Sequence, residues 1–150
     1  MQHDAARKPS VMTAKDIDAL LAREFPQAFH PGSGLAVEHV EFAACRVRQA
    51  FSERFVRPGG TVSGPTMMAL ADFAMYVAVF SAAGPVPLAV TTSLTINFLR
   101  KPARADLIAE ARLLKHGKRL VVGEVMIRSD REDEPVAHVT ATYSIPPGSG

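Results

Sequence analysis

The chain has 150 residues, of which 47% are hydrophobic and 21% are charged, and its formal net charge is +2 at pH 7. This composition is that of a globular protein and excludes long-range disorder for most of the chain, and the length fits one domain. So small a charge excludes a general nucleic-acid binder, which usually carries a strong basic stripe. The single cysteine, Cys45, excludes an internal disulfide and a cysteine-based zinc site.

The first ten residues, MQHDAARKPS, are polar and lead into a charged stretch, unlike a secretory signal with its apolar core. A lone thiol is also typical of a reducing compartment. One apolar run, Pro65–Ala83, approaches the length of a membrane span, but Asp72 interrupts it and no Lys or Arg closely flanks it. We therefore interpret this run as a buried core helix and expect a cytoplasmic protein with no membrane partner.

The first predicted element is a short helix, Ala14–Phe25, in which apolar residues recur at helical spacing. Pro26 ends this helix, because proline disrupts a helix that continues through it. Residues 1–12 before the helix, and residues 146–150 at the other end of the chain, are expected to be flexible tails.

Alternating apolar and polar residues predict six strands, two before the long apolar run and four after it. The polar turns between the last four strands, spaced about a dozen residues apart, indicate an antiparallel meander. In the third strand the alternation places Val90 and Leu94 on one face and Thr91 on the other. The predicted strands are Leu35–Ala43, Cys45–Val56, Leu88–Leu99, Leu107–His116, Leu120–Arg128 and Val136–Ile145.

The run Pro65–Ala83 has no polar face, and Pro65 stands in the first turn, where a helix tolerates proline best. A helix that is apolar all round must be buried on all sides, and in a small domain a sheet has to wrap around it. The predicted fold class is therefore α+β, a single domain in which an antiparallel sheet of six strands curls around one long helix.

Asp72 is the only charged residue within this predicted helix. Burying an unpaired carboxylate is costly, so its side chain must either have polar partners or face a cavity. In a structural role, Asp72 would bond to a neighbouring strand or to a symmetry-related chain. In a catalytic role, it would activate water or attack a substrate directly.

The start of the helix, Ser63-Gly64-Pro65, offers a second candidate group. The first N–H groups of a helix are free and lie at its positive end, so they can hold a carbonyl oxygen on which negative charge develops. Gly64 would let a substrate approach the backbone closely. Together with the carboxylate two turns further along, this N–H site forms a minimal apparatus for acyl transfer. Alternatively, Ser63 and Gly64 are only a cap and a turn, since helix starts favour these residue types.

These residues resemble the hot-dog-fold acyl-coenzyme A thioesterases, specifically the group that includes the phenylacetate-pathway thioesterase. The likeness covers roughly Leu35–Ile145 and is specific when its segments are taken together. The resemblance implies a long helix wrapped by an antiparallel sheet, an acyl-coenzyme A substrate, no metal or redox cofactor, and a homodimer or homotetramer. The segments are SGPTMMALADFAMYVAV, AVTTSLTINFLRKPARADLIAEARLLKHGKRLVVGEV and PVAHVTATYSI.

The resemblance also implies roles for individual residues. Asp72 matches the catalytic acid of the central helix, and Gly64 matches the glycine whose N–H polarises the thioester carbonyl. In the family these two usually come from opposite subunits, so the active site would be shared. Thr91 matches a hydroxyl position that can hold the attacking water in some members. The acyl group would lie between helix and sheet, near Met68, Phe73 and Tyr76.

Two positions depart from the family pattern. The family commonly has His-Gly-Gly where this chain has Ser63-Gly64-Pro65, and often an Asn six residues before that His, where this chain has Arg57. Ser63 can still form a hydrogen bond, and Arg57 can still donate one, with a charge that Asn lacks. These departures bear on turnover and on the choice of substrate rather than on the fold.

Six basic side chains are candidates for binding coenzyme A phosphates, which in the family lie on the surface near such segments. Lys and Arg suit phosphates through their charge and, for Arg, through forked donors. The alternative is that these residues only solvate a hairpin turn. The candidates are Arg100 and Lys101 at the end of one predicted strand, and Lys115, His116, Lys118 and Arg119 around the Gly117 turn.

Other chemistries lack their signatures in this sequence. The histidines show no paired ligand spacing and no H-E-x-x-H occurs, so we expect no metal site. Ser63 is not in a G-x-S-x-G elbow, and Gly32-Ser33-Gly34 lacks the third glycine of a dinucleotide fingerprint. A dehydratase of the same fold is disfavoured because no His lies within the helix. The leading hypothesis is an acyl-coenzyme A thioesterase, and the alternative is a non-hydrolytic acyl-coenzyme A binder.

Overall fold

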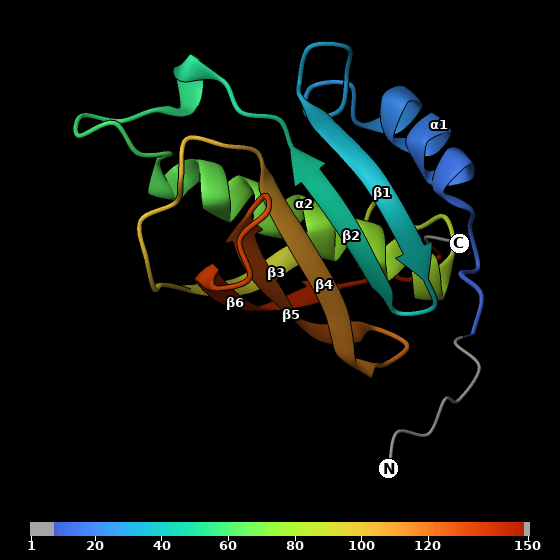
Figure 1. Ribbon diagram of the computed structural model, residues 1–150. Coiled ribbons are helices and arrows are strands. Elements are labelled where there is room, and N and C mark those ends of the chain that lie inside the picture. The colour runs from blue at the N-terminus through green and yellow to red at the C-terminus, as the bar shows by residue number, and fades with distance from the viewer. Residues whose placement is uncertain (1–7, 149–150) are drawn as a thin grey trace.

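The structure is a computed structural model, and it describes residues 8–148 of the chain. Within them, one six-stranded antiparallel sheet curves around the long helix α2, and the shorter helix α1 lies beside β1 (Figure 1). The predicted fold class, an α+β hot-dog fold, is confirmed. The strands lie in the order β1-β2-β4-β5-β6-β3, so β1 and β3 are the edges of the sheet. The elements are α1 (Ala14–Glu24), β1 (Leu35–Glu41), β2 (Ala44–Gln49), the 3₁₀ turn η1 (Glu53–Phe55), α2 (Gly64–Ala83), β3 (Val90–Phe98), β4 (Leu107–His116), β5 (Leu120–Ser129) and β6 (Pro135–Ser144).

Helix α2 forms because both of its ends are capped and its middle is apolar. Ser63 precedes it in an extended conformation, and the Ser63 Oγ accepts a hydrogen bond of 3.3 Å from the N–H of Thr66. Gly84 ends it at a φ of 85°, a backbone angle that residues other than glycine rarely adopt. By length and composition alone this helix would suffice to cross a membrane, but 72% of its most apolar stretch is buried inside the protein, as in a core helix.

The prediction that the long helix is buried on all sides is wrong along one stripe. Met68 and Ala69 are exposed, and Asp72 and Tyr76 are only half-buried. These residues recur every three or four positions and therefore share one face of the helix. The sheet covers the other sides of α2, so this stripe stays accessible. Asp72 lies on it and is therefore reachable from outside the core.

Strand β3 departs from simple alternation at one point. Its pairing with β6 sets Thr91 opposite Tyr143 and resumes at Ser93, so the register shifts between Thr91 and Ser93. Such a bulge inserts one residue and re-aims the neighbouring side chains. Thr91 consequently faces α2 on the same side as Leu94, whereas Val90 is 53% exposed. The predicted grouping of Val90 with Leu94, opposite Thr91, is therefore wrong.

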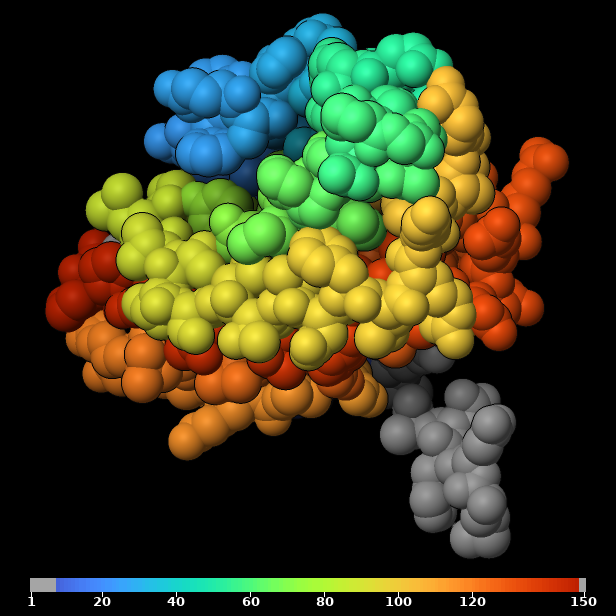
Figure 2. Space-filling model, turned by 90° about the vertical axis from the view of Figure 1, so that its left-hand side faces the viewer, coloured from blue at the N-terminus to red at the C-terminus, as the bar shows by residue number. Residues whose placement is uncertain are grey.

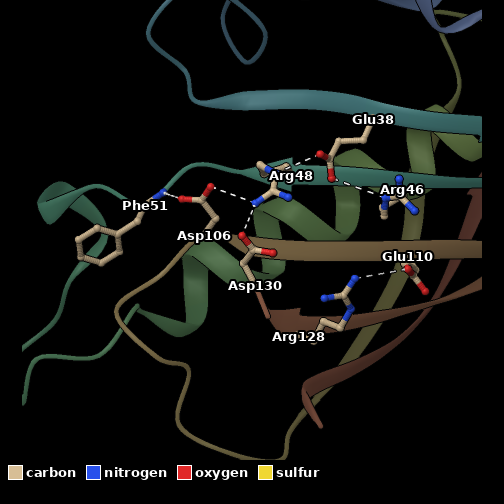
Figure 3. A network of polar contacts seen from close by, with 8 residues as sticks. All are labelled: Glu38, Arg46, Arg48, Phe51, Asp106, Glu110, Arg128 and Asp130. Atoms are coloured by element: carbon tan, nitrogen blue, oxygen red, sulfur yellow. Dashed lines mark hydrogen bonds and ion pairs between the residues drawn. The ribbon is translucent and has the colours of Figure 1, made fainter. Parts of the chain in front are cut away.

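The second predicted strand is too long, because the chain leaves the sheet well before Val56 and turns through η1. A polar network fixes the point of departure (Figure 3). The N–H of Phe51 donates to Asp106 Oδ1 at 2.8 Å, and Arg48 donates to Asp106 Oδ2 at 3.1 Å and to Asp130 Oδ2 at 2.9 Å. These bonds anchor the strand end and thereby position η1.

Part of the expected N-terminal tail is docked on the fold. Val11 donates a backbone hydrogen bond of 2.8 Å to a carbonyl of α2, and the carbonyl of Lys8 accepts one of 3.0 Å from the β1–β2 turn. These bonds connect residues 8–12, part of the expected flexible tail, to the fold, and the parts of the tails at residues 1–7 and 149–150 lie outside the described residues. The other boundaries differ from the predicted ones by only a few residues.

Candidate active site

A cavity of about 680 Å³ lies between helix α2, the link from α1 to β1, the turn η1 and the start of β3. Figure 2 shows this face of the molecule hollowed between the segments coloured blue, green and yellow. The residues of its lining that carry the site are Asp72, Phe73 and Tyr76 from α2, Thr91 from β3, Tyr143 from β6, and Ser33, Gln49, Arg54 and Phe55 from the opposite side.

The Asp72 carboxylate is held through one of its two oxygens. The Thr91 hydroxyl donates to Asp72 Oδ1 at 2.5 Å, and the Tyr143 hydroxyl donates to the same oxygen at 2.7 Å. Within residues 8–148 the other oxygen, Oδ2, has no hydrogen-bond partner, and it is not shut off from the cavity. The carboxylate is thus fixed in direction, while one oxygen remains available for chemistry.

Tyr143 is suited to remain a donor to this carboxylate. Its side chain is buried, which raises the pKa of the phenol well above its usual range, and the negative charge of Asp72 raises it further. The phenol therefore keeps its proton at neutral pH. Tyr143 was not among the predicted site residues, although it is the one polar residue on the inward face of β6, where Val139 and Ala141 are also buried.

The wall beside Asp72 is aromatic. The ring of Phe73 stacks on Phe29 with 5.8 Å between centroids, and the ring of Tyr76 lies 6.0 Å from that of Tyr143. The Tyr76 hydroxyl donates to the carbonyl of Pro87. Phe73 and Tyr76 thus lie in the cavity wall, where the acyl group was expected. Met68, by contrast, is 40% exposed and is not among the residues that line the cavity.

Gly64 is the first residue of α2, and within the described residues its N–H has no acceptor. It lies two turns before Asp72, which corresponds to about 12 Å along a helix axis. One carbonyl cannot reach both groups of the same chain across that distance. The ring of Phe98 covers the backbone here, since a Cβ on Gly64 would lie 3.1 Å from Phe98 Cζ.

Two other residues singled out at the helix start serve local structure in this chain. Ser63 caps α2, and its hydroxyl also lies 2.8 Å from that of Thr66. Arg57 opens a tight turn in which its N–H donates to the carbonyl of Thr61 at 2.9 Å, and its side chain is exposed. Neither residue is among those that line the cavity.

The six basic candidates fall into two groups at opposite ends of the sheet. Arg100 and Lys101 follow the end of β3, where Arg100 forms an ion pair of 2.8 Å with Glu134. The other group surrounds the β4–β5 turn, which lies level with the start of β3 because both pair with the end of β6. Within one protomer the two groups do not meet. The second group consists of Lys115, His116, Lys118 and Arg119, all exposed.

Potential metal ligands do not cluster in the part of the chain that the structure describes, where no three of His, Cys, Asp or Glu come together. Cys45 is buried on the inner face of β2, and its thiol donates to the carbonyl of Ala74 at 3.1 Å. Burial raises the pKa of this thiol to about 12, so it is a packing residue rather than a nucleophile.

Comparison with known proteins identifies relatives for most of the chain. A family model described as the thioesterase superfamily matches residues 59–136. The crystal structure of a proposed thioesterase from Silicibacter sp. TM1040 is 40% identical, covers 95% of this chain and 97% of its own, and superposes with a TM-score of 0.83. The phenylacetic acid degradation protein PaaI of Thermus thermophilus is 26% identical, with coverage of 81% and 99% and a TM-score of 0.69. A proposed esterase of Saccharolobus solfataricus is 30% identical over 115 residues, which are 77% of this chain and 74% of the relative.

Proposed function

Since the chain belongs to the thioesterase superfamily, as its sequence motifs predicted, we propose that it hydrolyses the thioester of an acyl- or aroyl-coenzyme A to the free acid and coenzyme A. The observation that carries this proposal is the Asp72 carboxylate, with Oδ1 held by two hydroxyls and Oδ2 open to a cavity with aromatic walls. Thioester hydrolysis needs a catalytic group beside a binding site for the acyl chain, and the fixed carboxylate and the cavity supply these. The reaction requires no metal or redox cofactor.

Asp72 supports two versions of this reaction. As a general base, Oδ2 takes a proton from a water molecule whose oxygen attacks the thioester carbonyl. The carbon–sulfur bond then breaks, and the leaving thiolate takes up the proton. As a nucleophile, Oδ2 attacks the carbonyl itself, the thiolate leaves, and water hydrolyses the resulting anhydride. Because Thr91 directs its only hydroxyl hydrogen to Asp72, it can serve an attacking water only as an acceptor.

Strand β3 provides a route by which a second copy of the chain supplies the Gly64 N–H. Thr91, near the start of β3, contacts Asp72, and Phe98, at its end, covers Gly64. Only one side of this strand is paired within the described part of the protomer. If two such strands pair antiparallel around a two-fold axis near their middle, the Gly64 end of one copy lies beside the Asp72 end of the other. A homodimer would then share two active sites, with a partner N–H facing the oxyanion.

The same pairing would unite the two groups of basic residues. Arg100 and Lys101 at the end of β3 in one copy would approach the β4–β5 turn of the other, because that turn lies level with the start of β3. A rim with charges from both copies would suit the phosphates of coenzyme A. This composite rim, rather than either group alone, is our proposal for the coenzyme A contact.

The departures at Ser63 and Arg57 favour a second candidate, a protein that binds acyl-coenzyme A without hydrolysing it. The experiment that separates the two is a free-thiol release screen with acyl-coenzyme A esters of different length and aromaticity, with binding measured in parallel by equilibrium dialysis. Thiol release that depends on the protein supports the thioesterase. Binding of the same esters with no thiol release over the whole panel supports the binder.

A further inference from the structure

Among the residues that the structure describes, Arg54 is the only arginine or lysine in the cavity lining, and it lies across the cavity from Asp72. It belongs to η1, which follows β2, whereas Asp72 is held by side chains from β3 and β6. Strands β1 and β2 form one edge of the sheet, and β6 and β3 form the other. The cavity therefore has one charged group at each side, with opposite signs, and apolar walls between them.

The guanidinium of Arg54 is oriented without being neutralised. Its Nη2 donates to the carbonyls of Gly32 at 3.1 Å and Ser33 at 3.0 Å, and its central carbon lies 4.6 Å from the centre of the Phe55 ring. In the part of the chain that the structure describes, no carboxylate lies within ion-pair distance of Arg54. Since a guanidinium has five N–H donors on three nitrogens, its Nε and Nη1 remain free to bind a ligand.

Neighbouring polar side chains make this side of the cavity a defined site. Gln49 is 8% exposed, and its Nε2 donates to the carbonyl of Ser33 at 3.0 Å, the same carbonyl that Arg54 contacts. His30 also lines the cavity, and its Nδ1 lies 2.8 Å from the carbonyl of Pro31, which leaves Nε2 without a partner among the described residues. A ligand that reaches this side meets a cation whose direction is fixed, beside a glutamine that already donates to a backbone carbonyl.

Resting on the proposed thioesterase function, we propose that the preferred acyl group carries a carboxylate at its far end, bound by Arg54. With the thioester at Asp72, the acyl chain would run along the aromatic wall of the cavity to the opposite side. There a carboxylate would replace the water that hydrates Nη1 and accept a charge-assisted hydrogen bond from it. The substrate class is thus the ω-carboxyacyl-coenzyme A esters, and Arg54 is a specificity residue.

The test measures a preference ratio, kcat/KM for ω-carboxyacyl esters divided by kcat/KM for unsubstituted esters of the same carbon number. Succinyl-, glutaryl-, adipoyl- and suberoyl-coenzyme A supply the first set. Because the Arg54 side chain is exposed and water screens its charge, we expect a ratio of about 3 to 10 for the best pair in the unmodified protein. Arg54→Gln should bring the ratio close to one, and Arg54→Lys, which keeps the charge but loses the contacts that orient the guanidinium, should give an intermediate value.

Arg23→Gln on α1 is the matched control, since it removes the same charge from an exposed arginine outside the cavity, and it should leave the ratio unchanged. A ratio near one in the unmodified protein would overturn the proposal. So would an equal loss for both ester sets in Arg54→Gln, because this would show that Arg54 only supports the loop or contacts coenzyme A. The ratio of dissociation constants for the two sets, measured on Asp72→Asn protein, tests the specificity even if hydrolysis itself fails.

Discussion

The Tyr143 hydroxyl contacts Asp72 at two points, 2.7 Å from the carboxylate Oδ1 and 2.9 Å from the main-chain oxygen of the same residue. One side chain of β6 therefore ties the direction of the carboxylate to the path of helix α2. Thr91 from β3 adds a second hydroxyl on Oδ1. The sequence left open whether the Asp72 side chain has polar partners or faces a cavity. Both are true, because Oδ1 has hydrogen-bond partners and Oδ2 faces the cavity.

Replacing Tyr143 with Phe should lower kcat about tenfold while KM stays nearly unchanged, because the carboxylate loses a hydrogen bond that orients it. The free energy of unfolding should fall by about 1 kcal/mol, as expected for a buried hydrogen bond. Steady-state kinetics and chemical denaturation measure both. Thr91→Val should act in the same direction. A change confined to KM, with kcat intact, would show that these hydroxyls bind substrate rather than position Asp72.

Gly64→Pro should abolish the proposed oxyanion donor, because proline has no N–H. Ser63 already has the extended conformation that a residue before proline requires, with φ −71° and ψ 153°. Gly64→Ala is the matched control: it places a similar Cβ near Phe98 but keeps the N–H. We expect kcat of the proline variant to fall about 100- to 1,000-fold below that of the alanine variant. Equal activities would remove Gly64 from the mechanism.

Mixing two inactive variants tests whether the active site is shared between copies. A heterodimer of Asp72→Asn and Gly64→Pro chains would contain one site with both native groups and one with neither. After unfolding and refolding together in equal amounts, activity should recover to about a quarter of the unmodified value, since half of the dimers are mixed and each has one intact site. If each site is built from a single chain, the mixture stays as inactive as its parts.

Gly123 on β5 allows the close approach of helix α2 to the sheet. A Cβ at this position would lie 2.5 Å from the sulfur of Met75 and 3.0 Å from the carbonyl oxygen of Arg112. Gly123→Ala should therefore lower the free energy of unfolding by about 1–3 kcal/mol, the usual cost of overpacking a core. Denaturant unfolding measures this loss. Thr140→Ala on the exposed face of β6 is the control and should change stability by less than about 0.5 kcal/mol.

The network around Arg48 predicts a dependence of stability on pH. The hydrogen bond from Arg48 holds the pKa of Asp130 below its ordinary value of 3.8. A carboxyl group with a lowered pKa in the folded state stabilises the fold above the unfolded pKa, and this contribution disappears as the pH falls through the folded pKa. Arg48→Gln should lower the melting temperature by about 2–4 °C at pH 7. The difference in melting temperature between the unmodified protein and Arg48→Gln should disappear below pH 3.8. An equal difference at pH 7 and below pH 3.8 would exclude the Asp130 carboxylate as its source.

The sequence was sufficient to predict the long helix and the six strands and to single out Asp72 as a candidate site residue. Helix-breaking residues, hydrophobic periodicity and one charge within an apolar helix are all local signals. The family resemblance placed Thr91 in the site, but alternation alone put it on the face opposite Leu94, since the bulge beside it depends on pairing with β6. Tyr143 and Arg54 were missed for a related reason. A tyrosine near the end of a strand and an arginine after one have no distinctive spacing, and only folding brings them to the cavity that Asp72 faces.

The central claim is that the Asp72 carboxylate performs the chemistry, and the most direct measurement is turnover of Asp72→Asn in the free-thiol assay, with Asp133→Asn on the exposed β5–β6 turn as the control. The amide keeps the shape of the side chain but can neither accept the proton nor attack as an anion. We predict a loss in kcat of at least about 100-fold with an unchanged melting temperature, as removal of a general base or nucleophile typically gives. Hydrolysis by Asp72→Asn at the rate of the unmodified protein would contradict the account.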